Sequence, residues 1–180
     1  MFECTEFELS YFKTAPVRLT YEEEISTSPA VLFAVFEDPA SWPQWARGIS
    51  EVEWTSPLPY GLNTTRTVTF LGGMEVYERF IGWVPGKHMA FCFTGATQRI
   101  WSSFGENYEV EDLGNNRCRL RWTVAYEPRF IFKALHPALG PLMKKALGLM
   151  LGKLRDYAEL HEPHYVEKIL KARDLEAITN

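Results

Sequence analysis

A carboxylate stands in the middle of an alternating segment, Met74–Trp83. If this segment is a strand, Glu78 shares one face with Val76 and Phe80, because successive side chains of a strand point to opposite faces. A carboxyl group buried on that face would have a raised pKa and could act as an acid, a base or a hydrogen-bond anchor. Both faces of the segment mix polar and apolar residues, so the opposite orientation, with Glu78 in solvent, stays open.

A second carboxylate occupies a similar position in Ser102–Glu111. Glu106 and Tyr108 alternate with Asn107 and Glu109, which predicts that Glu106 and Tyr108 share the inner face of a strand. The two inward glutamates are the candidate catalytic groups of the chain, and the tyrosine is a candidate ligand-binding residue.

Three further side chains could complete a binding site. Arg66 could pair with one of the sheet carboxylates, although a solvated surface arginine is the commoner outcome. Trp122 and Tyr126 belong to one apolar face of the segment Arg117–Glu127. We expect both aromatic residues to line a cavity, while a plain core role would also explain Trp122.

Short turns separate the segments that carry these residues. Gly72-Gly73 is typical of a tight hairpin, and Pro85-Gly86 is typical of a turn. Because the connections are short, the strands should form one antiparallel sheet of about six or seven strands. The predicted strands are Val17–Ile25, Ile49–Trp54, Thr64–Leu71, Met74–Trp83, Met89–Thr94, Ser102–Glu111 and Arg117–Glu127.

Two short helices are predicted after the first strand. Ser28 and Pro29 supply a hydroxyl cap and a first-turn proline for the helix Ala30–Phe36. Asp38-Pro39 repeats this pattern of a capping residue followed by proline, and it predicts a second short helix, which ends near Gly48.

One long helix, Pro141–Glu162, follows the strands, and Pro163 should end it. At 100° per residue, its apolar side chains fall within an arc of roughly 140°. We interpret residues 1–162 as a single domain, in which Met1–Ala15 form an edge strand or an arm, and residues 163–180 as a polar tail. The helix residues expected to line a cavity are Met143, Leu147, Met150 and Leu154.

Composition excludes several classes of protein. The chain has 180 residues, and its net charge of −4 argues against a nucleic-acid partner. Its aromatic content of 14% favours an interior lined with aromatic residues. Its start lacks the pattern of a signal peptide, and no apolar run reaches the roughly 18 residues of a membrane span. The three cysteines are an odd number and show no paired spacing, so we expect free thiols and a reducing, cytoplasmic location. No metal site and no cofactor are expected.

The order of the motifs resembles the START/Bet v1-like (SRPBCC) superfamily, in particular its polyketide cyclase/dehydrase and lipid-transport branch. The resemblance covers about Val17–His161. It implies an α+β helix-grip fold, in which a curved antiparallel sheet wraps around the C-terminal helix and leaves a cavity between them. The residues that carry it are Thr20-Tyr21-Glu22, Ser28-Pro29-Ala30, Leu32-Phe33, Asp38-Pro39, Trp42-Pro43, Trp45, Gly61, Thr64-Thr65-Arg66, Glu78, Trp83, Pro85-Gly86, Glu106, Tyr108, Leu120 and Trp122.

The resemblance implies binding of a small hydrophobic ligand such as a lipid, a polyketide or an isoprenoid, with transport of that ligand as a further option. One alternative is a polyketide cyclase, aromatase or dehydratase that uses the cavity carboxylates. A further alternative is a co-chaperone-like interaction module, which should have a filled core and no cavity. We expect either a monomer or a homodimer.

Overall fold

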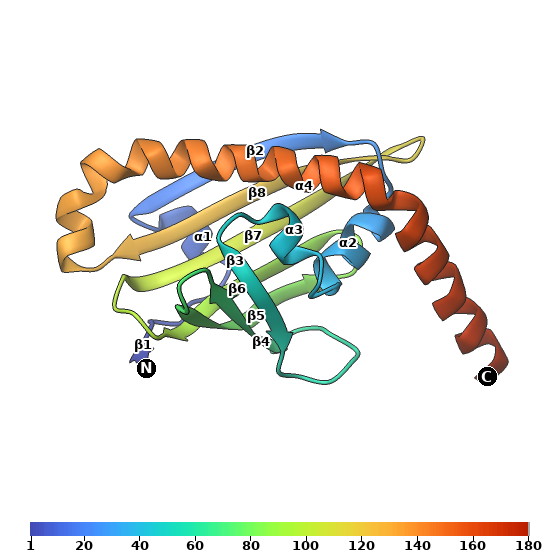
Figure 1. Cartoon of the computed structure of the whole chain (residues 1–180), viewed down its shortest axis with the longest axis horizontal. Coiled ribbons are helices and arrows are strands. Elements are labelled where there is room, and N and C mark those ends of the chain that lie inside the picture. The colour runs from blue at the N-terminus through green and yellow to red at the C-terminus, as the bar shows by residue number, and fades with distance from the viewer. Residues whose placement is uncertain (180) are drawn as a thin grey trace.

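The computed structural model describes residues 1–179, and the side chains of all of these except residues 131 and 175–179. It is an α+β fold in which a curled antiparallel sheet packs against one long helix (Figure 1). The strands are β1 (Phe2–Glu3), β2 (Val17–Ile25), β3 (Ile49–Trp54), β4 (Thr65–Phe70), β5 (Glu75–Val84), β6 (His88–Ala96), β7 (Trp101–Gly114) and β8 (Arg117–Pro128). The helices are α1 (Tyr11–Thr14), α2 (Pro29–Glu37), α3 (Trp42–Trp45) and α4 (Phe130–Thr179).

The sheet is a meander, as predicted. Its strand order is β2-β8-β7-β6-β5-β4-β3, so every neighbouring pair except β2 and β8 is also consecutive in the chain. The first long strand, β2, therefore pairs with the last one, β8, while β2 and β3 form the two opposite edges of the sheet. The predicted bounds of Val17–Ile25 and Ile49–Trp54 are confirmed, and the other strands differ by a few residues at their ends.

The two short helices lie between β2 and β3, also as predicted. The Ser28 hydroxyl accepts a hydrogen bond from the Val31 amide at 3.3 Å and caps α2. The second helix, α3, is only four residues long and begins later than expected. The reason is that Asp38 forms a turn instead of capping a helix, since its carboxylate accepts from the Ala40 amide at 3.0 Å.

The prediction for the long helix is wrong at both ends. α4 begins at Phe130 and continues through Pro137, Pro141 and Pro163, and it changes direction toward each end (Figure 1). A proline removes one backbone donor and bends a helix, but it does not stop the chain from continuing. Beyond Pro163, Tyr165 is buried and its hydroxyl donates to the Asp38 carboxylate at 3.1 Å, which ties this turn to the domain. Among residues 1–179, no helix has both the length and the apolarity to cross a bilayer.

The N-terminal segment is an arm on the outer face of the sheet. Only Phe2–Glu3 pair as a strand, with the end of β6, and the alternation at residues 7–11 does not form one. Phe7 and Phe12 instead pack on a second apolar cluster that faces away from α4. The outward residues beneath the arm are small, which makes room for its aromatic rings; they are Ala90, Cys92, Gly105 and Ala125.

Candidate ligand-binding cavity

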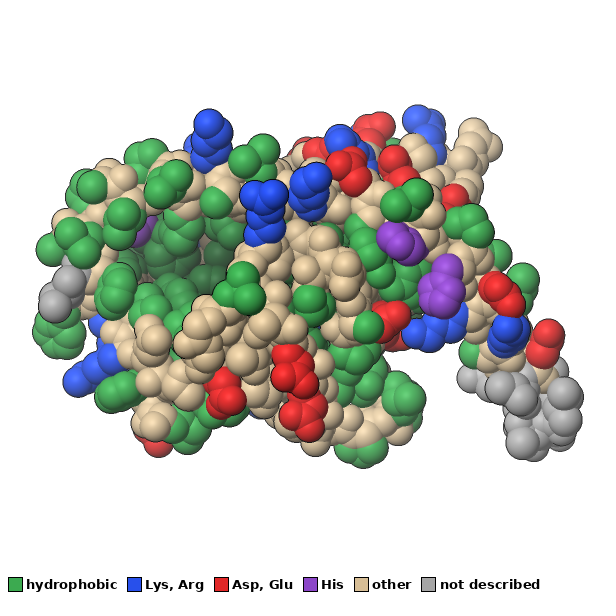
Figure 2. Space-filling view, in the orientation of Figure 1, with side chains coloured by type: hydrophobic (Ala, Val, Ile, Leu, Met, Phe, Trp, Pro, Cys, Tyr) green, Lys and Arg blue, Asp and Glu red, His purple; other side chains and the backbone are tan. Residues whose placement is uncertain are grey.

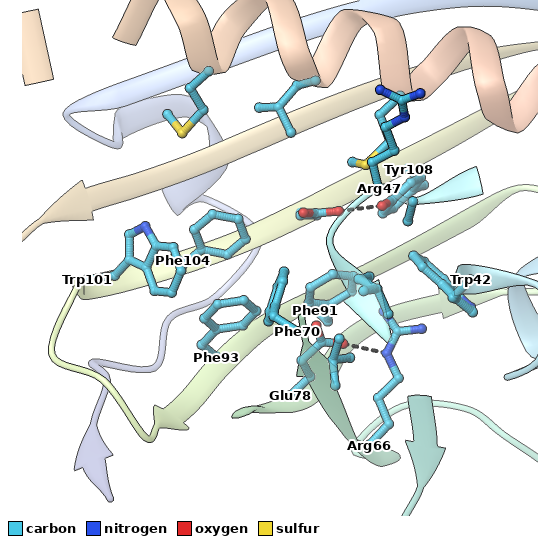
Figure 3. Close-up of a pocket in the computed structure, with 17 residues that line it drawn as sticks. Trp42, Arg47, Arg66, Phe70, Glu78, Phe91, Phe93, Trp101, Phe104 and Tyr108 are labelled. Carbon is cyan, nitrogen blue, oxygen red and sulfur yellow. Dashed lines mark hydrogen bonds and ion pairs between the residues drawn. The ribbon is translucent and has the colours of Figure 1, made fainter. Parts of the chain in front are cut away.

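A cavity of about 190 Å³ lies between the inner face of the sheet and α4. The residues after β2, in and beyond α3, close one side of it (Figure 3). In the space-filling view the cavity opens to the surface as a hollow with hydrophobic walls (Figure 2). Its lining residues are Trp42, Ala46, Arg47, Ile49, Arg66, Val68, Phe70, Glu78, Phe91, Phe93, Trp101, Phe104, Glu106, Tyr108, Met143, Leu147 and Met150.

Aromatic rings from β6 and β7 form one wall of the cavity. The rings of Phe93 and Phe104 stack with their centroids 4.4 Å apart, and the edge of Trp101 meets Phe93 at 5.5 Å. Ring pairs in these geometries attract each other beyond the effect of their buried area. The wall is therefore flat and well packed on the sheet side, while the helix side presents the more adaptable Met143 and Met150.

An ion pair lies on the cavity floor. Arg66 and Glu78 face each other directly across β4 and β5, and the Arg66 Nε donates to the Glu78 carboxylate (Figure 3). The two side chains are only 1% and 4% exposed. This orientation answers the question that the sequence left open, because Val76, Glu78 and Phe80 all face inward.

Four aromatic rings surround the guanidinium of Arg66. Its central carbon lies 4.1 Å from the ring of Trp42 and 4.9 Å from that of Phe91, and the rings of Trp54 and Phe80 follow at 5.4 and 5.2 Å. Cations attract the faces of aromatic rings in this range. The Arg66 Nη1 is buried and has no hydrogen-bond partner among the described residues. Arg66, which lines the cavity floor, therefore keeps one donor that no described protein group satisfies.

Two irregularities in the pairing of β5 with β6 bracket Glu78. One register shift lies between Tyr77 and Glu78, and the other between Phe80 and Gly82. Such bulges bend a strand and re-aim its side chains. They place Glu78 opposite Phe93, within the aromatic part of the cavity.

Glu106 is the second carboxyl group in the cavity. The Tyr108 hydroxyl and the Trp122 indole Nε1 both donate to its Oε2, the latter at 3.0 Å. Burial raises the pKa of the Glu106 carboxyl to about 7, and the nearby Glu78 carboxylate adds to this, although the hydrogen bonds from Tyr108 and Trp122 oppose it. The proton occupancy of Glu106 therefore changes near neutral pH.

The pKa values of two other titratable groups of the cavity are raised as well. Burial raises the pKa of the Glu78 carboxyl, and the charge and hydrogen bond of Arg66 beside it offset this rise only in part. Burial and the Glu106 carboxylate together hold the pKa of Tyr108 well above its ordinary value of 10.0. We take Glu78 as the charged partner of Arg66 because the two are in direct contact. Glu106 is then the group suited to gaining and losing a proton.

Most residues expected to bind a ligand do line the cavity, and three do not. Trp122 lies behind Glu106 and holds it by a hydrogen bond. Tyr126 lies opposite the lining residue Phe104, but its hydroxyl group is hydrogen-bonded to His136 Nε2 at 2.7 Å and it is not itself among the lining residues. Leu154 is buried in the main core. The expected residues that line the cavity are Arg66, Glu78, Glu106, Tyr108, Met143, Leu147 and Met150.

Sequence reasoning missed several lining residues. Phe91 and Phe93 alternate with Cys92 in β6, and this alternation could have placed both rings on one face of the strand. Arg47 carried no such signal, because it lies in an irregular segment after α3.

A curled sheet that grips a C-terminal helix around a cavity defines the helix-grip class of ligand-binding folds. The chain belongs to the polyketide cyclase / dehydrase and lipid transport family, whose model matches residues 16–159. The expected family is therefore confirmed.

The chain is similar to one relative in sequence and to two solved structures in fold. The chain is 38% identical over 162 residues to an uncharacterised protein of Mycobacterium tuberculosis, a match that covers 88% of this chain and 95% of the relative. The Zhui aromatase/cyclase of Streptomyces sp. R1128 superposes with a TM-score of 0.67 at 12% identity, over 81% of this chain and 94% of that one. A START superfamily protein of Mycobacterium smegmatis superposes with a TM-score of 0.60 at 14% identity, over 79% and 94% of the two chains.

Proposed function

We propose that the protein binds a small hydrophobic ligand that carries an oxygen acceptor, such as a carbonyl or carboxyl group. The observation that carries this proposal is the buried, unpartnered Nη1 of Arg66 on the floor of an aromatic cavity. Apolar walls favour the ligand by removing its surface from water, and the few polar groups fix its orientation. Arg66 would donate to the acceptor, and Glu106 would face the same region with or without its proton.

The cavity suits a compact ligand. Its volume of about 190 Å³ is below the roughly 300 Å³ at which drug-sized pockets begin. A longer molecule would have to displace the flexible side chains of Met143 and Met150, or extend through the mouth of the cavity. The cavity also argues against the interaction module, for which a filled core was expected.

Binding can be tested by native mass spectrometry and by tryptophan fluorescence. Trp42 and Trp101 line the cavity, so titration with fatty acids or flat polycyclic compounds should change their emission. In Leu147→Phe a larger side chain enters the cavity and should weaken binding by about tenfold. The matched control is Leu160→Phe, on an exposed position of the same helix. No response from a broad apolar panel, with no co-purified molecule, would contradict the proposal.

A second candidate is an enzyme of the cyclase or dehydratase type. It is favoured by the convergence of Arg66, Glu78 and Glu106 on one cavity, because a poised acid beside a cation suits proton transfer next to a carbonyl. Arg66 would polarise the carbonyl, and a carboxyl group would move the proton.

If the protein is an enzyme, replacing its catalytic carboxyl groups should stop turnover but leave ligand binding nearly unchanged. Glu106→Gln and Glu78→Gln should abolish turnover of a polyketide-like substrate while ligand affinity, measured by fluorescence, changes little. Unchanged turnover in both variants would exclude the acid and base roles and would leave the binding function standing.

A further inference from the structure

Arg129 and the first half of α4, which follows it, are strongly basic. Residues 129–153 contain five lysines or arginines and no aspartate or glutamate, in a chain whose net charge is −4. Lys145 and Lys153 are exposed, and neither lies within ion-pair distance of a carboxylate among the described side chains. The rest of the molecule is acidic, so positive charge is concentrated on this helix.

The same half of α4 exposes large apolar side chains. Leu142 and Leu149, which are 67% and 65% exposed, both follow Pro141 and lie about 20° apart around the helix, so they form a stripe along one side of it. Lys145 and Lys153 lie on the two sides of this stripe, within about 40° of it. Leu135 and Leu139, which are 45% and 47% exposed, precede Pro141 and add apolar surface where the helix changes direction.

The stripe meets the mouth of the cavity. A surface groove of about 370 Å³ runs beside α4 between Arg47, Leu149 and Lys153. This groove shares Arg47, Leu147 and Met150 with the cavity. Figure 2 shows hydrophobic side chains around the rim of the hollow and basic side chains at its upper edge.

We propose that this leucine stripe, with Arg47, Lys145 and Lys153, docks on the surface of an anionic phospholipid bilayer. Leucines enter the boundary between headgroups and acyl chains, and basic side chains beside them attract anionic headgroups. A second copy of this chain fits the face less well. A two-fold interface would bring the same basic residues of both copies together without an acidic counterpart in residues 129–153.

Docking in this way turns the mouth of the cavity toward the lipid. A hydrophobic ligand could then pass between the bilayer and the cavity without crossing bulk water. Only this consequence rests on the proposed ligand-binding function; the docking itself rests on the surface of α4.

Vesicle sedimentation of the full-length protein tests the docking. The protein should sediment with vesicles in which about a third of the phosphatidylcholine is replaced by phosphatidylglycerol, and should remain in solution with phosphatidylcholine alone. Added salt should release it, because screening weakens the attraction. Lys145→Glu with Lys153→Glu, and separately Leu142→Ser with Leu149→Ser, should each weaken the binding by about tenfold or more.

Matched controls lie elsewhere on the molecule. Leu160→Ser changes an exposed leucine of α4 outside the basic half, and Lys87→Glu changes an exposed lysine of the β5–β6 turn. Both controls should bind vesicles like the unaltered protein, and circular dichroism should show that all variants are folded.

Three results would overturn the docking. The first is equal sedimentation with neutral and anionic vesicles, or with neither. The second is full binding by the lysine and leucine variants. The third is a dimer, seen by light scattering, that becomes a monomer in Leu142→Ser with Leu149→Ser, because the stripe would then be covered by a second copy. Ligand binding that persists without vesicle binding would overturn the docking and leave the proposed function intact.

Discussion

Arginine and glutamate face each other across neighbouring strands on both surfaces of the sheet. On the inner surface Arg66 of β4 pairs with Glu78 of β5, and on the outer surface Arg121 of β8 pairs with Glu22 of β2. The inner side chains are 1% and 4% exposed, and the outer ones are 56% and 47% exposed. The chemistry and the cross-strand arrangement are the same, so the two pairs differ chiefly in burial.

Burial changes what such a pair does. The exposed charges keep their water, and dissolved salt screens their attraction. The buried charges have lost their water and depend on each other, so removing one leaves the other without compensation. The inner pair is therefore costly to break, whereas the outer pair is interchangeable surface charge.

The largest expected effect comes from breaking the inner pair. Arg66→Ala leaves the Glu78 carboxylate buried without a partner and should lower the free energy of unfolding by about 3–5 kcal/mol. Urea denaturation measures this change. The double variant Arg66→Met with Glu78→Leu removes both charges and should recover most of the lost stability. Neither variant should bind the ligand, because both lack the Arg66 donor. Failure of the double variant to recover stability would show that packing, and not the lost charge, explains the first result.

A smaller effect should come from Glu106, as a dependence of stability on pH. Its ordinary pKa of 4.5 applies to the unfolded chain, and burial raises the pKa to about 7 in the fold. The folded protein therefore holds this proton more tightly, which stabilises the fold fully below about pH 4.5. This stabilisation, on the order of 3 kcal/mol, is lost as the pH rises toward 7.

Glu106→Gln isolates this contribution. A glutamine cannot titrate, so the variant should lack this part of the fall in stability between about pH 5 and pH 8, measured by urea denaturation at each pH. The same pH slope in both proteins would show that Glu106 does not hold a proton near neutrality.

The smallest effect should come from the outer pair. Arg121→Ala exposes no buried charge, because Glu22 is already in contact with water. The urea midpoint should stay close to that of the unaltered protein, and any difference should shrink further in high salt. A loss as large as that of Arg66→Ala would mean that burial does not explain the difference between the two surfaces.

Strand positions were accessible from the sequence because they depend on local patterns. Alternation and turn residues located Val17–Ile25 and Ile49–Trp54 to the residue. The inward orientation of Glu78 was not accessible in this way, because both faces of its strand carry mixed residues. The Glu78 side chain points into the cavity because β5 pairs with β4 and β6 in this register, with bulges beside Glu78. Such pairing is a property of the whole sheet.

The predicted ends of α4 were wrong for a related reason. Pro141 and Pro163 are local signals for a helix boundary, but contacts distant in sequence outweighed them. Tyr165 is held by Asp38, a residue whose own role was misread as a helix cap. The partner of Arg66 was open for the same reason, since only the register of β4 against β5 brings Glu78 opposite it.

The small residue Gly105 ties the N-terminal arm to the cavity. It lies between Phe104 and Glu106, which face the cavity, and its own outer side touches the ring of Phe7. A methyl group at this glycine would come within 2.6 Å of that ring and within 2.5 Å of the Phe91 carbonyl oxygen. The sheet at this point is one backbone thick, with the arm on one side and the cavity on the other. The first residues of the chain thus support the cavity wall from outside, and the shape of the cavity depends on a segment that does not line it.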